Sequence, residues 1–367
     1  MTDRSNARPR LLFVCMHESS FVRTDLELLP EQYDVLKFSG HGVDLSNPLR
    51  LVAFLLRQAI WLLRHAPTAD VIYGWFADYH MVLPVLAARV FRKPSAVVLA
   101  GFDSNHLPEI GYGVYASPWR APAAKYVLRN CSLLLPLTRT LIHSENTYTT
   151  WPRQAEHGIE AHAGKEHAPF RAIGTGYDPE RWPMGPAERP PSVVTVAFID
   201  SLRTAQVKGL DVFAEAARLL PEVPFSVVGV LPEMVYSLSS SLTLPPNVSL
   251  LPPAGASELV SIYGTTSVYA QLSRTEGVPS VLCEAMLCGC VPVGSRVFGV
   301  QEIIGDTGPL LDSPEPNVVA AAIRSALEAG SEARRRARQR IIENYHIDRR
   351  RQALFEALRE MHARTAR

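Results

Sequence analysis

The segment Val193–Leu220, VVTVAFIDSLRTAQVKGLDVFAEAARLL, contains the clearest strand-to-helix unit in the chain. It opens on an unbroken β-rich apolar run, Val193–Ile199, and Gly209–Leu220 has the periodicity of an amphipathic helix. A second apolar run, Ser226–Val230, follows. Strands that are apolar on both faces and alternate with helices are typical of a parallel sheet covered by helices on both sides. The pattern predicts an α/β fold.

The same alternation occurs on both sides of a proline-rich segment, residues 183–191 (PMGPAERPP). Such a segment can neither continue a helix nor enter the interior of a sheet. We therefore expect two doubly wound, Rossmann-like domains, residues 1–182 and 192–346, with 183–191 as a hinge and a ligand cleft between the domains. The last helix, within 347–367, is expected to pack back onto the first domain. The expected strands are Leu11–Cys15, Val71–Gly74, Ala96–Leu99, Leu133–Leu135, Phe170–Ile173, Val193–Ile199, Ser226–Val230, Val248–Leu251, Val268–Leu272 and Val291–Val293.

Composition limits the class of protein. The chain has 367 residues, 47% hydrophobic and 20% charged, which is enough apolar material for two cores and excludes a disordered chain. Its net charge of +1 argues against nucleic acid as a partner. The five cysteines lack the spacing of a zinc site and are expected to be buried thiols. The polar start MTDRSNARPR predicts no signal peptide and a cytoplasmic location.

The stretch Ser273–Gly289, SRTEGVPSVLCEAMLCG, has the pattern of an anion site. Pro279 suits the first turn of a helix of about ten residues, and Gly289 suits its C-terminal cap. The amides of Gly277 and Val278 then lie at the helix N-terminus, where the helix dipole and unpaired N–H groups favour a phosphate.

Glu284 is the only charged residue between Gly277 and Ser295. A carboxylate in such an apolar helix is either neutral or hydrogen-bonded to a polar group. One interpretation is a glutamate satisfied by a backbone amide or an arginine of its own domain. The other is a ligand contact, in which the carboxylate accepts two hydroxyl hydrogens, as a ribose offers.

Two cations, Arg203 and Lys208, follow the strand Val193–Ile199 in one strand–helix loop. Cations at the carboxyl end of a strand can clamp a diphosphate. The alternative for each cation is a solvated surface position, but two on one loop favour the clamp.

These residues together resemble the signature of glycosyltransferase family 4. Glu276 and Glu284 stand in the setting S-x-x-E-G-x-P-x-x-x-x-E-A-M-x-x-G, and Arg203…Lys208-Gly-Leu-Asp resembles the family's R-x-x-x-x-K-G-x-D loop. The segment Pro292–Glu302 resembles its P-V-x-x-x-x-x-G-x-x-E run, and Gly176–Trp182 its N-G-V-D-x-x-x-F turn.

The resemblance implies the GT-B fold and a retaining, metal-independent transfer of sugar from a nucleotide diphosphate sugar, without a cofactor. It implies that Arg203 and Lys208 hold the diphosphate, that Glu284 binds the ribose and that Glu276 contacts the donor sugar. The donor contacts it implies beyond these are Gly277, Val278, Pro279 and Ser280. The expected partners are that donor, with UDP- or GDP-sugars favoured, and a hydroxyl acceptor in glycan, polysaccharide or glycolipid synthesis.

The first domain departs from the family pattern. The loop Met16–Phe21 contains no glycine, whereas many members have a Gly-Gly pair there. Many members also have a histidine after the fourth strand; here Asp103 is the first stand-in by position, and His106 the second. A loop aspartate can equally be a turn former. His17 and Glu18 are further candidates on the acceptor or sugar side.

Two arginine-rich features bear on membranes. Arg50, Arg57 and Arg64 recur every seven residues along the apolar stretch Leu49–Leu63, which fits a helix on a membrane surface. The alternative, which we favour, is an internal crossover helix with a charged outer stripe. The clusters Arg334–Arg336 and Arg349–Arg351 are expected to be solvated.

The predicted function is therefore a glycosyltransferase, cytoplasmic or at the inner face of the membrane, with Glu276, Arg203, Lys208 and Asp103 as catalytic candidates. The opposing hypothesis is a catalytically silent GT-B protein that binds a nucleotide sugar or assists an active transferase. A GT-B sugar epimerase is a third alternative.

Overall fold

The computed structural model describes residues 8–40, 47–146, 148 and 156–365. The chain divides into two units. Unit 1 comprises Met1–His143, His157–Gly176 and Asp348–Arg367, and unit 2 comprises Ser144–Glu156 and Tyr177–Ile347. The division at Gly176 lies ahead of the proline-rich segment, which belongs to unit 2 throughout.

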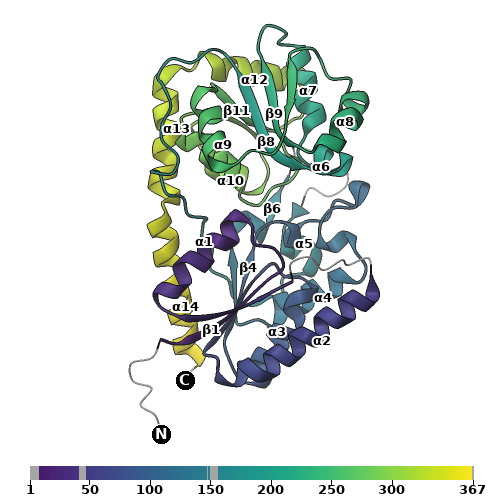
Figure 1. Cartoon of the computed structure of the whole chain (residues 1–367), viewed down its shortest axis with the longest axis vertical. Helices are drawn as coiled ribbons and strands as arrows, with labels where there is room; N and C mark the ends of the chain where they lie inside the picture. The colour runs from purple at the N-terminus through teal and green to yellow at the C-terminus, as the bar shows by residue number, and fades with distance from the viewer. Residues whose placement is uncertain (1–7, 41–46, 147, 149–155, 366–367) are drawn as a thin grey trace. The chain divides into compact units, whose positions relative to one another are not determined.

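Unit 1 is built on a five-stranded parallel sheet in the order β2-β1-β3-β4-β5 (Figure 1). Edge strand β2 was not expected, because its charged and half-exposed residues break the apolar run. The expected strand Phe170–Ile173 is not a regular strand: it forms an isolated bridge at Phe170 with Leu134 of β5, although Arg171 and Ile173 also donate to the carbonyls of Leu134 and Pro136. The strands are β1 (Arg10–Cys15), β2 (Asp34–Ser39), β3 (Val71–Trp75), β4 (Ser95–Leu99) and β5 (Leu133–Pro136).

Helices cover both faces of this sheet. In Figure 1, α1 and α14 lie on one face and α2, α3 and α4 on the other. Asn47 caps α2 by accepting hydrogen bonds from the amides of Leu49 and Arg50, and Pro48 occupies the first turn. The helices are α1 (Ser20–Leu28), α2 (Pro48–His65), α3 (Tyr79–Val90), α4 (Arg120–Asn130), α5 (Ile159–Ala163) and α14 (Ile347–Thr365).

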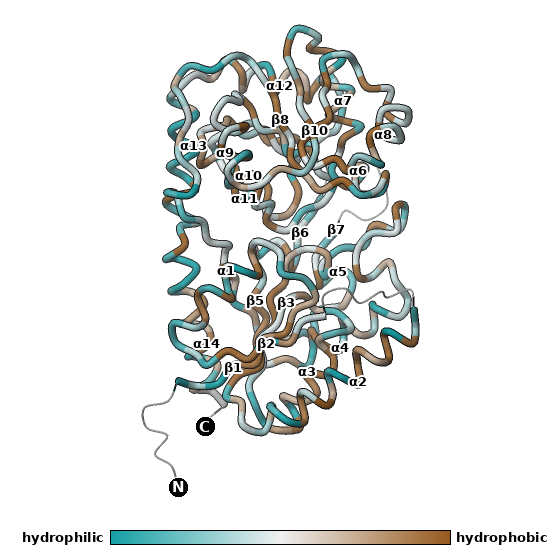
Figure 2. Tube along the Cα trace, in the orientation of Figure 1, coloured by the Kyte–Doolittle hydropathy of each residue, from teal (hydrophilic) through white to brown (hydrophobic). Residues whose placement is uncertain are grey.

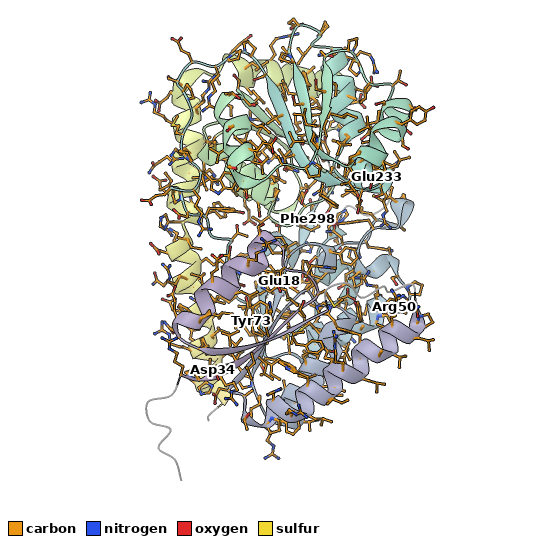
Figure 3. The ribbon with its side chains drawn as sticks, in the orientation of Figure 1. Glu18, Asp34, Arg50, Tyr73, Glu233 and Phe298 are labelled. Carbon is orange, nitrogen blue, oxygen red and sulfur yellow. The ribbon has the colours of Figure 1, made fainter. Side chains whose placement is uncertain are left out.

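The outer face of α2 carries more than the expected charged stripe. The helix is a crossover between β2 and β3, as anticipated, and its inner side buries Phe54 and Leu62. Its outer side exposes large apolar residues, with arginines beside them; Figure 3 labels Arg50 near the start of the helix. The expected charged stripe is present, since Arg50, Arg57 and Arg64 are exposed, but their seven-residue spacing did not reveal that large apolar residues are exposed beside them.

The last helix is fastened to unit 1 by a buried ion pair. Arg350 on α14 contacts Asp25 on α1, with Nε–Oδ1 and Nη2–Oδ2 distances of 2.7 and 2.8 Å. Tyr73 and Trp75 also donate hydrogen bonds to Asp25, and the side chains of the pair are 1% and 0% exposed. The expectation that Arg349–Arg351 is solvated is thus wrong for its middle residue.

Unit 2 contains a six-stranded parallel sheet in the order β10-β9-β8-β11-β12-β13. Numbered from its own first strand, this is 3-2-1-4-5-6, the order of the dinucleotide-binding Rossmann sheet. Figure 2 shows hydrophobic residues concentrated on the central strands. The strands are β8 (Val193–Ile199), β9 (Phe225–Val230), β10 (Val248–Leu251), β11 (Val268–Gln271), β12 (Val291–Ser295) and β13 (Leu310–Leu311).

The helices of unit 2 flank this sheet, with α7 against α12 and α10 against α13. The α/β class with two parallel, doubly wound sheets is therefore confirmed. The helices are α6 (Leu202–Val207), α7 (Leu210–Arg218), α8 (Val235–Leu242), α9 (Ala256–Thr265), α10 (Ser280–Leu287), α11 (Phe298–Ile304), α12 (Pro316–Glu328) and α13 (Gly330–Tyr345). Two short strands, β6 (Ser144–Glu145) and β7 (Glu156–His157), lie where the chain leaves unit 1 after His143 and returns to it at His157.

Arginines fasten the proline-rich segment to unit 2. Arg189 donates to the carbonyls of Tyr263, Thr266 and Cys288 at 2.6–2.9 Å. Arg334 on α13 donates to the carbonyl of Ala187 and is only 6% exposed, so the expectation of a solvated Arg334–Arg336 cluster is wrong for Arg334. Several arginines of this chain therefore satisfy backbone carbonyls inside the fold.

The remaining composition-based expectations concern thiols and membrane spans. All five cysteines are free and buried, as expected. Among the described helices, none combines the length and the apolar character needed to cross a bilayer.

Candidate functional site in unit 2

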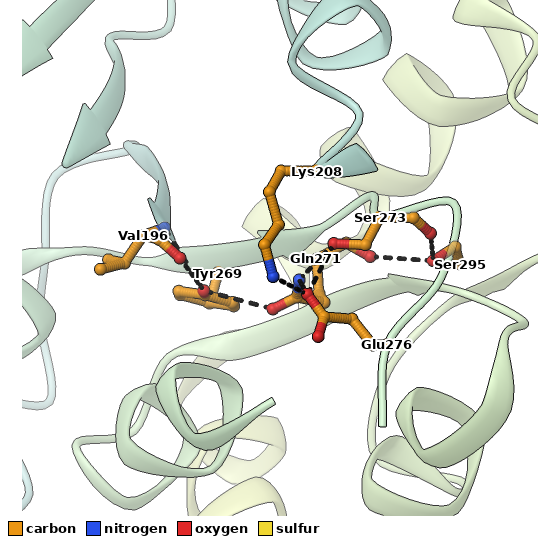
Figure 4. A network of polar contacts seen from close by, with 7 residues as sticks. All are labelled: Val196, Lys208, Tyr269, Gln271, Ser273, Glu276 and Ser295. Atoms are coloured by element: carbon orange, nitrogen blue, oxygen red, sulfur yellow. Dashed lines mark hydrogen bonds and ion pairs between the residues drawn. The ribbon is translucent and has the colours of Figure 1, made fainter. Parts of the chain in front are cut away.

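Glu276 is the centre of a polar network at the carboxyl edge of the unit 2 sheet (Figure 4). Its Oε1 atom accepts hydrogen bonds from Lys208 Nζ, Ser273 Oγ at 3.1 Å and Gln271 Nε2 at 3.4 Å. The Lys208 and Glu276 side chains keep 27% and 13% of their surface exposed, so a ligand can reach both.

This network lies at the topological switch point of the sheet. Lys208 follows β8 through α6, Glu276 follows β11, and β8 and β11 are the neighbouring strands at which the strand order reverses. Open α/β sheets bind their ligands outside the carboxyl ends of the strands at this point. The position of the pair is thus where a nucleotide ligand is expected.

Buried polar residues hold the loop that carries Glu276. Gln271 Nε2 donates to Ser273 Oγ at 2.7 Å, and Tyr269 donates to Gln271 Oε1 at 3.3 Å. Ser295 donates to the carbonyl of Ser273 at 2.6 Å. Gln271 and Ser295 were not among the predicted site residues. The position of Gln271, a polar residue at the end of the apolar strand β11, could have indicated its role.

A second set of contacts places Lys208 beside the network. Gly209 has a φ of +68°, and a Cβ built on it would lie 2.0 Å from the carbonyl oxygen of Leu272, so only glycine fits there. Arg274 binds both oxygens of Asp211 at 2.6 and 2.8 Å and donates to the carbonyl of Gln206 at 2.6 Å. The loops after β8 and β11 are thereby joined. Asp211 is the last residue of the motif that begins at Arg203, but its partner Arg274 was not predicted.

Arg203 lies apart from this network. The segment expected to be a loop forms the short helix α6, capped by Ser201, and Arg203 is exposed in its first turn. The structure therefore brings Lys208 and Glu276 together and leaves Arg203 outside their contacts.

The turn before α10 is pressed against α11. Gly299 donates its amide to the carbonyl of Gly277 at 3.0 Å, and a Cβ on Gly299 would lie 2.1 Å from that oxygen. Gly277, Val278 and Pro279 are buried and Ser280 is half-buried. The helix has eight residues rather than about ten, because Pro279 is its N-cap and Cys288 its C-cap.

Glu284 on α10 is buried without compensation. Its residue is 9% exposed, and burial raises the pKa of its carboxyl from 4.5 to about 7. Burial is the sole cause of this shift, with no charge or hydrogen bond within the described residues to offset it. Among the described residues, no amide or arginine contact of the Glu284 carboxylate is found, which favours the ligand interpretation. Hydroxyl donors from a ligand would supply the missing partners.

The candidates of unit 1 form no comparable cluster. Asp103 is fully buried and accepts backbone hydrogen bonds from Ala77, Ala100 and Gly101 at 3.0–3.2 Å. Burial raises the pKa of its carboxyl to about 6, against the lowering effect of these N–H groups. Its Oδ1 atom holds the turn after β4 and its Oδ2 atom ties this turn to Ala77 after β3, which is the turn-forming alternative for this residue.

The other three unit 1 candidates differ in accessibility. Glu18 pairs with Lys37 at 2.6 Å, and His17 beside it is exposed. His106 is half-buried, with its ring 5.4 Å from that of His162 between centroids. Burial, followed by the charges of neighbouring histidines, lowers the pKa of His162 to about 4.

Comparisons with known proteins show the family of the chain. Residues 189–344 match the family model "Glycosyl transferases group 1". A D-inositol 3-phosphate glycosyltransferase of Corynebacterium urealyticum is 30% identical over 311 residues, 76% of this chain and 68% of that protein. The chain belongs to the group 1 glycosyltransferases. A second protein of that name, from Mycobacterium sp. (strain KMS), is 31% identical over 156 residues, and the match spans 40% of this chain and 35% of the relative.

Solved structures show the same fold for this group 1 glycosyltransferase. Sucrose-phosphate synthase from Thermosynechococcus elongatus superposes with a TM-score of 0.73 at 16% identity, over 97% of this chain and 100% of the other. Anabaena Alr3699/HepE in complex with UDP-glucose gives 0.68 at 17% identity, over 96% and 99%. The expected GT-B fold, with two Rossmann-like halves, is thus confirmed.

Proposed function

We propose that this group 1 glycosyltransferase moves a sugar from a nucleotide diphosphate sugar to a hydroxyl acceptor, with retention of anomeric configuration. The observation that carries the proposal is the pair of unlike glutamates in one loop–helix unit. Glu276 is bound by Lys208, whereas the largely buried Glu284 has no partner among the residues that the structure describes. A donor that presents a diphosphate and two adjacent ribose hydroxyls complements both.

Lys208 stabilises the leaving group in this proposal. As the bond between the anomeric carbon and the phosphate oxygen breaks, negative charge grows on the diphosphate. A fixed ammonium beside that oxygen stabilises the transition state more than the ground state. Arg203, which is exposed at the other end of α6 from Lys208, is the second proposed cation. We propose that its long side chain reaches the diphosphate.

Retention follows from attack on the face from which the phosphate leaves. The acceptor oxygen bonds to the anomeric carbon, and the hydroxyl proton passes to the departing diphosphate, so charge and atoms balance without an added base. In this role the protein cations replace a bound metal. Glu276, held by three donors, orients the hydroxyls of the donor sugar.

The donor and acceptor classes are part of the proposal. UDP-sugars are the first candidates, supported by the UDP-glucose complex of the Anabaena neighbour, and GDP-sugars the second. Among the unit 1 candidates, His17, Glu18 and His106 are retained for the acceptor or sugar side. Asp103 is not, because both its oxygens are committed to backbone amides. A cytoplasmic location stays a prediction.

The full chain with UDP-, GDP- and ADP-sugars tests the proposal. We expect one donor to release its nucleotide diphosphate, with activity retained in EDTA and, once an acceptor is found, a product of unchanged anomeric configuration by NMR. A donor at 100 times its Kd should also stabilise the fold by about 2.7 kcal/mol. Stabilisation without release by any donor would instead support the silent binding protein.

A further inference from the structure

The outer side of α2 carries an apolar stripe. Five residues on it are 53–80% exposed. Their spacing of three or four residues keeps them on one side of a helix that is 18 residues, or about 27 Å, long. The stripe consists of Leu49, Val52, Leu56, Ile60 and Leu63.

A shallow apolar groove continues the stripe onto α3. Its volume is about 520 Å³, and Trp119, 48% exposed, lies at its edge. Leu86 and Val90, 45% and 65% exposed, follow one and two turns after Val82 of the groove. Monomeric proteins rarely expose apolar surface that is continuous over two helices. The groove is lined by residues of α2 and α3, and by Trp119.

The charge around the stripe has one sign. Neither α2 nor α3 contains an aspartate or glutamate, although the whole chain balances 37 basic against 36 acidic residues. Arg50, Arg57 and Arg64 each follow a leucine of the stripe, and so lie about 100° around the helix from it. Arg57 is held over the Phe38 ring, 5.3 Å from its centroid, and donates to the carbonyl of Ser39. A row of cations thus runs along one edge of the apolar stripe.

We propose that this face of α2 and α3 binds the surface of an anionic lipid bilayer. An amphipathic helix lies in the plane of a bilayer when its apolar side enters the acyl boundary and basic residues meet acidic headgroups. Trp119 at the edge of the groove suits the interface, where aromatic rings gather. A second copy of the chain is a poorer occupant, because a two-fold contact would bring these arginine rows toward one another. The inference concerns unit 1 alone and does not depend on the proposed sugar transfer.

Vesicle co-sedimentation of the full chain tests it. With vesicles of phosphatidylcholine and 30 mol% phosphatidylglycerol, we expect binding that weakens as salt rises, and little binding to phosphatidylcholine alone. Replacing two apolar residues, Leu56→Glu with Ile60→Glu, should abolish it. Replacing two cations, Arg50→Gln with Arg64→Gln, should lower the partition coefficient roughly thirtyfold, given the contribution of each cation near an acidic surface.

Matched controls keep the result interpretable. Leu219→Glu with Val318→Glu changes two exposed apolar residues of unit 2 and should leave vesicle binding intact. Near-ultraviolet circular dichroism checks that each variant is folded. Absence of binding to anionic vesicles, or equal binding by the Leu56/Ile60 variant, would overturn the proposal. Analytical ultracentrifugation provides a further test. A concentration-dependent dimer that is lost in the Leu56/Ile60 variant and is not displaced by vesicles would also overturn the proposal.

Discussion

Lys208 and Glu276, 68 positions apart in the sequence, form an ion pair where the strand order of unit 2 reverses. Each charge offsets the other in the free protein, and both remain partly exposed. A bound diphosphate would compete with Glu276 for the ammonium. In the free protein, Glu276 therefore balances the charge of Lys208 and holds its ammonium where a phosphate could bind.

Removal of this cation gives the first prediction. Lys208→Ala should lower kcat for nucleotide diphosphate release by about 10²-fold or more, as expected for loss of a preorganised charge contact. Arg203→Ala tests the second proposed cation, and we expect a loss of the same order. Arg335→Ala, an exposed position on α13, is the control. Near-native turnover in both Lys208→Ala and Arg203→Ala would contradict the assignment of the diphosphate site.

Glu284 gives a pH-dependent prediction. Between pH 4.5 and about 7 the folded chain holds a proton that the unfolded chain has lost, so the free energy of unfolding falls as pH rises through this window. Glu284→Gln removes this penalty. The variant should be more stable than the native protein at pH 8, by on the order of 3 kcal/mol, and equally stable at pH 4.

Donor affinity should also depend on the ionisation of Glu284, but it should rise with pH, whereas the stability falls. Ribose hydroxyls donate best to an ionised carboxylate, so donor affinity should weaken as pH falls below about 7. Glu284→Gln should bind donor weakly at every pH, by isothermal titration calorimetry. A variant that is less stable at pH 8 and binds donor normally would show that Glu284 has a structural role.

The Arg274–Asp211 pair is predicted to position Lys208. Asp211→Ala removes the partner of a guanidinium that joins the loops after β8 and β11. We expect kcat to fall about tenfold with little change in KM, because a catalytic group is misplaced rather than removed. Asp211→Asn, which keeps one acceptor, should recover part of the loss. Equal kcat in the alanine variant and the native enzyme would exclude this role.

The Asp25–Arg350 pair gives a prediction about stability. Asp25→Ala leaves the buried Arg350 guanidinium without its carboxylate and should cost about 3–5 kcal/mol in chemical denaturation. Asp34→Ala removes the partner of Arg10 in an exposed pair, with side chains 39% and 50% accessible, and should cost less than about 1 kcal/mol. Similar costs for both variants would mean that α14 is held mainly by apolar contacts.

Much of the fold could be predicted from local pattern. The buried strands β1, β3, β4 and β8 were placed to within a residue or two, because a strand covered on both faces is a continuous apolar run. The edge strand β2 was missed, since Asp34 and Lys37 interrupt its pattern. Phe170–Ile173 runs beside β5 but forms only an isolated bridge, and a four-residue pattern does not show how far such pairing extends.

The candidate site divides in a similar way. The motif spacing was enough to select Lys208, Glu276 and Glu284, since residues that follow neighbouring strands of a parallel sheet meet at one edge. Gln271, Ser295 and Arg274 were missed because their roles depend on partners elsewhere in the chain.

Sequence alone determined most of the alternation of strands and helices, and the spacing of the candidate-site motif, because hydrophobic periodicity and residue spacing are local properties. Tertiary structure alone decided which charges are buried and which are paired. It placed Arg350 beside Asp25, gave Glu284 no partner within the described part of the chain, and exposed the leucines of α2 as well as its arginines. Each of these outcomes depends on which side chains neighbouring elements place around a residue. Desolvation and charge pairing follow from those neighbours and not from the position in the sequence.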